Sequence, residues 1–163
     1  MPLMESKLSS TVKFRRLLGH SMGGLNATTL VMHRPELFRS AALLAPAYLG
    51  ISPYADRATQ TQYESSRGMP HDSARGVMSI ARAFVDNDEQ WRNFSPTIAG
   101  AWMLNSKSPA LYVSAGKKDL LFYEEARIFA GLAEKTGAQV IWDSHEGNHG
   151  QLKAEAIAQF LML

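Results

Sequence analysis

The sequence contains no cysteine among its 163 residues. That absence excludes a disulfide framework, a thiolate nucleophile and every zinc site that depends on cysteine ligands. No apolar run approaches the roughly 20 residues needed to span a bilayer. Residues 1–7 lack the basic stretch and the following apolar segment of a secretory signal. We therefore expect no contact with a membrane, and a cytoplasmic location by default.

An excess of charge of one sign is also missing. Lysine and arginine number 17 against 15 aspartate and glutamate residues, so the formal net charge is +2. This small, scattered surplus argues against nucleic acid as a partner. The hydrophobic content of 45% and the charged content of 20% are those of an ordinary globular protein. The chain is long enough for one core, and we treat 1–163 as a single domain.

Apolar runs and helical patterns alternate along the chain. The apolar runs predict strands at 12–18, 40–45, 110–115 and 139–143, and the patterns predict helices at 23–33, 122–135 and 151–163. Strands that alternate with helices indicate a parallel sheet with right-handed crossovers. The predicted fold class is therefore α/β, with a parallel sheet of about four strands flanked by helices.

Residues 47–108 interrupt this alternation. The segment is polar, carries several prolines and glycines, and shows helical periodicity only at 77–85 and, more weakly, at 97–104. We interpret 47–108 as a mostly helical insertion at the rim of the sheet, which could act as a lid over a site.

The most informative motif lies at residues 19–24, with the sequence Gly-His-Ser-Met-Gly-Gly. A serine between two glycines, after a strand and before a helix, is the pattern of a nucleophile elbow. In so tight a turn, we expect a Cβ at Gly19 or Gly23 to collide with the neighbouring strand or helix. The Met22 N–H at the start of the helix could stabilise a developing oxyanion. The alternative is a glycine-rich turn that only packs.

Two further residues follow predicted strands in positions that suit an elbow serine. Asp119 comes after the strand at 110–115, and His149 comes after the strand at 139–143. The chain order Ser21, Asp119, His149 is that of the hydrolase arrangement, and all three fall at the carboxyl edge of a parallel sheet. Asp119 could instead cap the following helix, and Asp143 and His145 compete as acid and base.

A metal site has little support. His145 and His149 have the i, i+4 spacing of helical ligands, but Gly147 and Gly150 argue against a helix there. No third ligand is evident, so we expect neither a metal nor a cofactor. We interpret His20 as structural, orienting or packing beside the elbow.

Three segments resemble the α/β-hydrolase superfamily, and within it the esterase D and enterochelin-esterase-like serine esterases. They are 17–24 (LLGHSMGG), 112–119 (YVSAGKKD) and 146–149 (EGNH), and 91–96 (WRNFSP) resembles a further segment of that group. The resemblance implies an esterase that acts on small-molecule esters without a cofactor.

The resemblance also implies roles for single residues. Ser21 would be the nucleophile, His149 the general base and Asp119 the residue that holds its imidazole, with Met22 in the oxyanion hole. The reaction would run through an acyl-enzyme. Thioesterase, peptidase and acyltransferase activities use the same groups and stay open.

The chain departs from that superfamily at its N-terminal side. The elbow begins within the first twenty residues, whereas superfamily members have several strands before it and a loop that supplies a second oxyanion N–H. We therefore expect the C-terminal half of an α/β-hydrolase fold, from a truncated gene product or a fragment. The strand at 12–18 would be an open edge, through which copies of the chain could associate.

That departure supports a second class of function. The chain could be a non-catalytic remnant that binds a ligand or a partner chain. If it is an esterase, we expect the segment 47–108 to shape the substrate pocket. The candidate lining residues are Tyr48, Phe84, Trp91 and Trp102.

Overall fold

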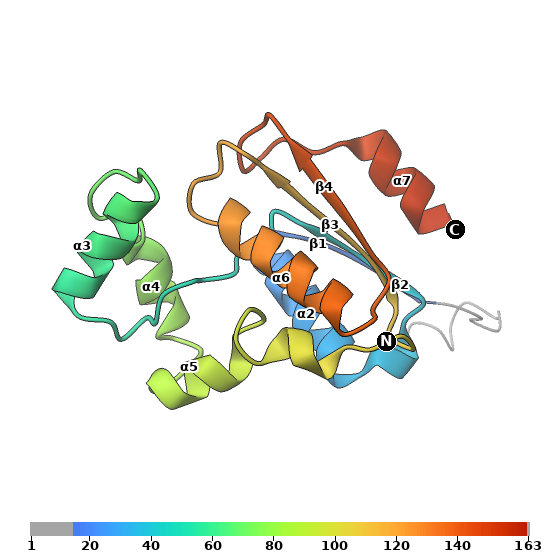
Figure 1. Cartoon of the computed structure of the whole chain (residues 1–163), viewed down its shortest axis with the longest axis horizontal. Helices are drawn as coiled ribbons and strands as arrows, with labels where there is room; N and C mark the ends of the chain where they lie inside the picture. Colours follow the sequence, from blue (N-terminus) through green and yellow to red (C-terminus); the bar gives the residue numbers. More distant parts are fainter. Residues whose placement is uncertain (1–14, 163) are drawn as a thin grey trace.

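The computed structural model of the chain describes residues 15–162. A four-stranded parallel sheet with the order β1-β2-β3-β4 forms its centre (Figure 1). The strands are β1 (Arg16–His20), β2 (Ser40–Leu44), β3 (Ala110–Gly116) and β4 (Val140–His145). The prediction of a parallel α/β sheet of about four strands is confirmed. Of the strand expected at 12–18, residues 12–14 lie outside the described part, and β1 continues to His20.

Helices cover the two faces of the sheet unequally. On one face, α2 (Met22–His33) packs on β1 and β2, and α6 (Tyr123–Lys135) packs on β3 and β4. The larger apolar core fills the space between them. On the other face, α7 (Ala154–Met162) contacts β2 through a smaller cluster that includes Ile157 and Phe160. All five residues of β2 are buried, because β2 is covered on both faces.

Residues 47–108 contain more helix than their sequence pattern predicts. The elements are α3 (Arg57–Ser66), α4 (Arg75–Ala81), α5 (Asp88–Phe94) and the 3₁₀ helix η2 (Gly100–Met103); a shorter 3₁₀ helix, η1 (Pro35–Leu37), follows α2. Of these, η2 falls within the segment expected at 97–104, and α4 overlaps the segment expected at 77–85 but begins two residues earlier and ends at Ala81. The sequence analysis missed α3 and α5. Both are capped by side chains, since Asp56 accepts from the Thr59 N–H and Asn87 from the Gln90 N–H, each at 2.8 Å.

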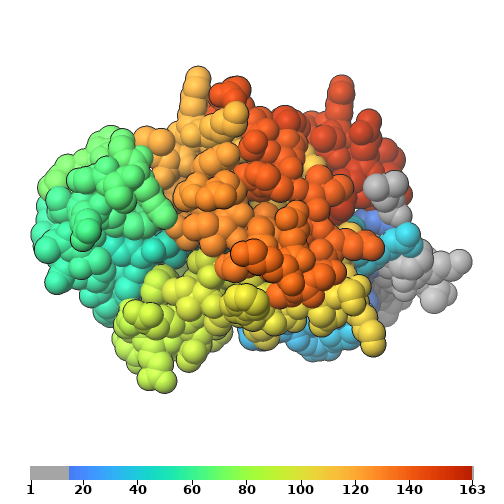
Figure 2. All heavy atoms as spheres, viewed as in Figure 1, coloured from blue at the N-terminus to red at the C-terminus, as the bar shows by residue number. Residues whose placement is uncertain are grey.

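Buried carboxylates hold this helical region together and join it to α6. Glu64 on α3 is 2% exposed and accepts the backbone N–H groups of Asp72 and Ala74, each at 2.9 Å. Glu125 on α6 forms an ion pair with Arg67, which follows α3. Burial raises the pKa of Glu125, and the neighbouring Arg67 opposes that rise. In Figure 2 the residues of α3 form a lobe beside the body that contains the sheet.

The described residues include no helix that is both long and apolar enough to cross a membrane. The strand β1 lies at one edge of the described sheet, where the sequence analysis placed an open edge. Association of copies through that edge stays a prediction.

Close backbone contacts fix the turn between β1 and α2. A Cβ on Gly19 would overlap the carbonyl group of Gly23, and a Cβ on Gly24 would lie 3.0 Å from Pro46 Cα. The expectation for Gly23 itself was wrong, because a Cβ there would meet nothing within 4 Å. The two positions that need glycine are therefore Gly19 and Gly24, where the strand, the helix and the 45–47 turn approach one another.

Replacing Gly19 and Gly23 by alanine, one at a time, tests whether the close contact lies at the first position and not at the second. We expect Gly19→Ala to lower the free energy of unfolding by about 1–3 kcal/mol or more, because backbone atoms must move to admit the methyl group. Gly23→Ala is the matched control, and we expect it to be neutral or to stabilise by up to about 1 kcal/mol through higher helix propensity. Thermal and urea unfolding measure both. Equal changes in the free energy of unfolding for the two variants would contradict the close contact between Gly19 and the Gly23 carbonyl group.

Candidate active site

Ser21 lies in a strained turn between β1 and α2. Its backbone has φ 55° and ψ −121°, a positive φ that costs a non-glycine residue about 1–3 kcal/mol. Three backbone hydrogen bonds hold that conformation. The Ser21 N–H donates to Leu44 O at 3.0 Å, and the Ser21 carbonyl accepts from the Leu25 and Ala47 N–H groups at 3.1 and 3.0 Å. The Ser21 side chain does not cap α2, so its hydroxyl is free to face other groups.

Two loops bring Asp119 and His149 to that hydroxyl. Asp119 follows β3 and His149 follows β4, at the same edge of the parallel sheet. His149 Nε2 lies 2.9 Å from Ser21 Oγ, and His149 Nδ1 lies 2.6 Å from Asp119 Oδ2. With Nδ1 donating to the carboxylate, Nε2 is left to accept the serine hydroxyl. The structure thus brings together the three side chains that the sequence analysis selected.

Asp119 serves two contacts at once. Its side chain is buried, and its second oxygen, Oδ1, accepts the Phe122 N–H at 3.3 Å just before α6. The contact of Oδ1 is the one that the alternative interpretation of Asp119, as a cap of the following helix, requires. The other oxygen faces His149, so the two roles coexist.

Two rings lie close to the His149 imidazole although this residue is in a loop. The His20 ring centroid is 4.9 Å from that of His149, and the Phe122 ring centroid is 5.2 Å away. His20 Nε2 also donates to the His149 carbonyl oxygen at 2.8 Å. Because a carbonyl can only accept, the proton of His20 lies on Nε2 in this contact. Sequence reasoning gave His20 a structural place beside the elbow, but no pattern indicated its bond to the His149 loop.

The competing acid and base have other partners. Asp143 on β4 accepts hydrogen bonds from the Tyr112 hydroxyl and from Lys153 Nζ. Burial acts to raise the pKa of Asp143, but these two hydrogen bonds outweigh it and hold that pKa below its ordinary value. His145 Nδ1 accepts the Gly147 N–H at 3.1 Å. Among the described residues, the hydrogen bonds to Ser21 Oγ and Asp119 Oδ2 come from His149 and from neither of these two side chains.

Met22 is the first residue of α2, directly after Ser21. The N–H groups of the first helical turn have no partner within the helix, and they carry the positive end of its dipole. A negative oxygen beside Ser21 would face this end. Within residues 15–162, no group of three or more histidine or acidic side chains is placed to hold a metal ion.

The candidate lining residues separate into two pairs. Phe84 and Trp91 line an apolar cavity that begins at Met22. Tyr48 does not, because it is fully buried in the core with its hydroxyl 2.5 Å from Thr28 Oγ1. Trp102 is 61% exposed and lies outside the cavity.

Comparison with solved structures shows the fold. Carboxyl esterase 2 from Tuber melanosporum aligns with a TM-score of 0.67 and 17% identity over 98% of this chain and 56% of its own. A thermostable esterase from Pseudomonas putida aligns with 0.62 and 18% over 83% and 42%. A fungal esterase from Rhizomucor miehei aligns with 0.65 and 16% over 89% and 47%. The chain therefore spans about half the length of these esterases.

Sequence comparison identifies the family. No curated protein sequence matches the chain significantly. The profile of the family described as "Putative esterase" matches residues 1–149, which is most of the chain and ends at His149 itself. The fold shared with α/β-hydrolase esterases agrees with that match. The chain belongs to this esterase family.

Proposed function

We propose that this chain carries the nucleophile, base and acid of a serine esterase that hydrolyses carboxylic esters. One observation carries the proposal: an unbroken run of hydrogen bonds joins Ser21 Oγ, His149 and Asp119 at the carboxyl edge of a parallel sheet. Membership of the esterase family supports it. The chain spans about half the length of the compared esterases. That the chain is active by itself is therefore part of the proposal.

In the proposed mechanism, Ser21 Oγ attacks the ester carbonyl carbon while His149 Nε2 takes the hydroxyl proton. Asp119 Oδ2 holds Nδ1–H and stabilises the imidazolium that forms. The tetrahedral oxyanion receives a hydrogen bond from the Met22 N–H. Its collapse breaks the bond to the alcohol oxygen, and His149 returns the proton to that oxygen. Water, deprotonated by His149, then attacks the acyl carbon. Collapse of this second intermediate breaks the bond to Ser21 Oγ, which takes the proton back from His149, and the carboxylic acid leaves.

In this mechanism the oxyanion has one assigned donor, the Met22 N–H. In the superfamily that segment 17–24 resembles, a loop ahead of the elbow supplies a second N–H to the oxyanion. Loss of one such donor lowers kcat by about 10²–10³. We therefore expect slow turnover from the chain alone, with the nucleophile still reactive toward a strong electrophile.

A fluorophosphonate probe tests the nucleophile. We expect covalent labelling of one serine, Ser21, because His149 Nε2 accepts its proton at 2.9 Å. Intact-mass and peptide mass spectrometry locate the adduct. Ser21→Ala is the control and should not label. A folded sample that does not label would sink the proposal and favour a non-catalytic binding role.

Replacing each aspartate by asparagine tests whether Asp119 or Asp143 is the acid that holds His149. We expect Asp119→Asn to slow labelling and ester turnover by about 10³–10⁴, because an amide no longer fixes the imidazole tautomer. The amide oxygen can still accept the Phe122 N–H, so the start of α6 keeps its contact. Asp143→Asn is the matched control, whose effect we expect on stability only. A larger loss of activity in Asp143→Asn would overturn the assignment.

We further propose that His20 is a positioning residue for His149. Its Nε2–H holds the backbone of the loop that carries the base. We expect His20→Leu to lower kcat by about 10²-fold with little change in KM, because a displaced base misaligns proton transfer.

His20→Gln provides the control, since its amide can donate from nearly the same place. Partial rescue by glutamine, with unchanged melting temperatures, would support positioning. If His20→Leu and His20→Gln behave alike in kcat, the hydrogen bond to His149 is not the cause.

A further inference from the structure

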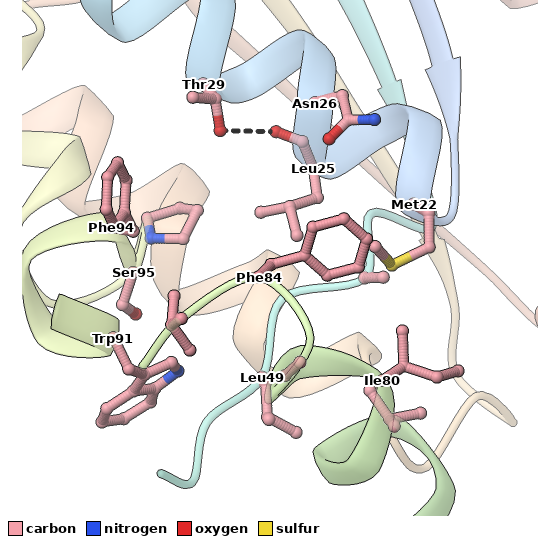
Figure 3. Close-up of a pocket in the computed structure, with 15 residues that line it drawn as sticks. Met22, Leu25, Asn26, Thr29, Leu49, Ile80, Phe84, Trp91, Phe94 and Ser95 are labelled. Carbon is pink, nitrogen blue, oxygen red and sulfur yellow. Dashed lines mark hydrogen bonds between the residues drawn. The ribbon is translucent and has the colours of Figure 1, made fainter. Parts of the chain in front are cut away.

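An apolar cavity of about 240 Å³ opens between α2 and the region 77–96 (Figure 3). On α2 its lining residues include Met22 and Leu25, and on the opposite side they include Ile80, Phe84 and Trp91. Met22 directly follows Ser21, so one end of the cavity lies beside the nucleophile. The cavity therefore approaches the candidate active site at Met22, although Ser21 itself is not among its lining residues.

The lining carries no charge. None of its residues is acidic, basic or histidine, and its polar side chains are those of Asn26, Thr29 and Ser95. The Thr29 hydroxyl already donates to the Leu25 carbonyl at 3.0 Å. A carboxylate or ammonium group in this cavity would lose its water without gaining an ionic partner, which is costly. The cavity thus favours a neutral, apolar group.

Large apolar side chains are exposed at this cavity. Phe84 is 70% exposed, Ile80 51% and Phe94 47%. A concentration of exposed apolar surface around a cavity marks a binding site more often than chance. A bound apolar group would remove these side chains from water, and that burial would supply binding free energy.

The position of the cavity selects one side of the ester. The leaving alcohol must lie toward His149, because His149 Nε2 returns the proton to the alcohol oxygen. No residue from the loops of Asp119 and His149 lines the cavity. The cavity therefore extends from Met22 on the side of Ser21 away from the loop of His149, which is the side we assign to the acyl chain.

The volume sets the size of the acyl group. An apolar cavity of about 150 Å³ accepts a benzene molecule. At about 240 Å³, this cavity has room for a phenyl ring with a few further carbon atoms, or for a branched alkyl chain.

We infer that this cavity is the acyl-binding pocket and that it selects esters of neutral, bulky acids, aryl or branched alkyl, over esters of small or charged acids. The inference rests on the proposed esterase function and names its substrate class. The segment 47–108 then contributes one side of the pocket, which is the place the sequence analysis proposed for it.

Esters that share one leaving group test the acyl preference. The p-nitrophenyl esters of phenylacetic, isovaleric, acetic and succinic acid differ only in the acyl part, the last as its monoester. We expect kcat/KM for phenylacetate and isovalerate to exceed that for acetate and hemisuccinate by about tenfold or more. Equal values across the series would overturn the inference.

Two substitutions connect the preference to the cavity. Ala81 lines it, whereas Ala83, two residues on, is exposed and does not. We expect Ala81→Phe to fill the space and to lower the phenylacetate-to-acetate ratio of kcat/KM by about tenfold or more. Ala83→Phe should leave that ratio unchanged. If Ala81→Phe does not fold, Ile80→Arg, at a half-exposed position, should raise the hemisuccinate-to-phenylacetate ratio; no rise would overturn the inference.

Labelling of Ser21 keeps the two proposals apart. Hydrolysis with a labelled Ser21 but no acyl preference rejects the pocket and leaves the esterase function standing. No hydrolysis and no labelling in a folded sample rejects the esterase function, and the substrate class with it.

Discussion

The close crossing of β1, α2 and the 45–47 turn is the constraint on which the rest of the site depends. Gly19 and Gly24 lack the Cβ atoms that would push these segments apart. At the crossing, the Ser21 carbonyl accepts two N–H groups, one of them from Ala47, and the Ser21 N–H reaches β2. These bonds offset the cost of a positive φ at a serine.

The parallel sheet supplies the second requirement, a common edge. Every strand ends at the side where Ser21 lies, so the loops after β3 and β4 deliver Asp119 and His149 to one place. Because the buried strand β2 lies between the strand of the serine and the strand of the acid, it keeps the turn after β1 and the loop after β3 at a fixed spacing. Rigid strands thus position groups that are carried by irregular loops.

Local patterns were sufficient for the strands, for the elbow and for the three residues that meet there. They failed at α3 and α5, whose sequences are polar and whose ends are marked by Asp56 and Asn87 rather than by apolar periodicity. They also misjudged Gly23, since the collision falls on Gly19 and Gly24 instead. Phe84 and Trp91 were expected to line a pocket, and they line the cavity. The contribution of Leu25 on α2 was not expected, because α2 and Ile80 come to the same cavity only through tertiary packing.

His20 and Ser21 are neighbours in the chain, and both contact the same imidazole residue, one at its backbone oxygen and the other at Nε2. A small displacement of β1 against β3 and β4 would therefore carry nucleophile and base together. Their mutual distance would be preserved while the separation from Asp119 absorbed the change. Two adjacent residues thus hold both the backbone and the ring of the base, and this ties the position of His149 directly to that of the nucleophile.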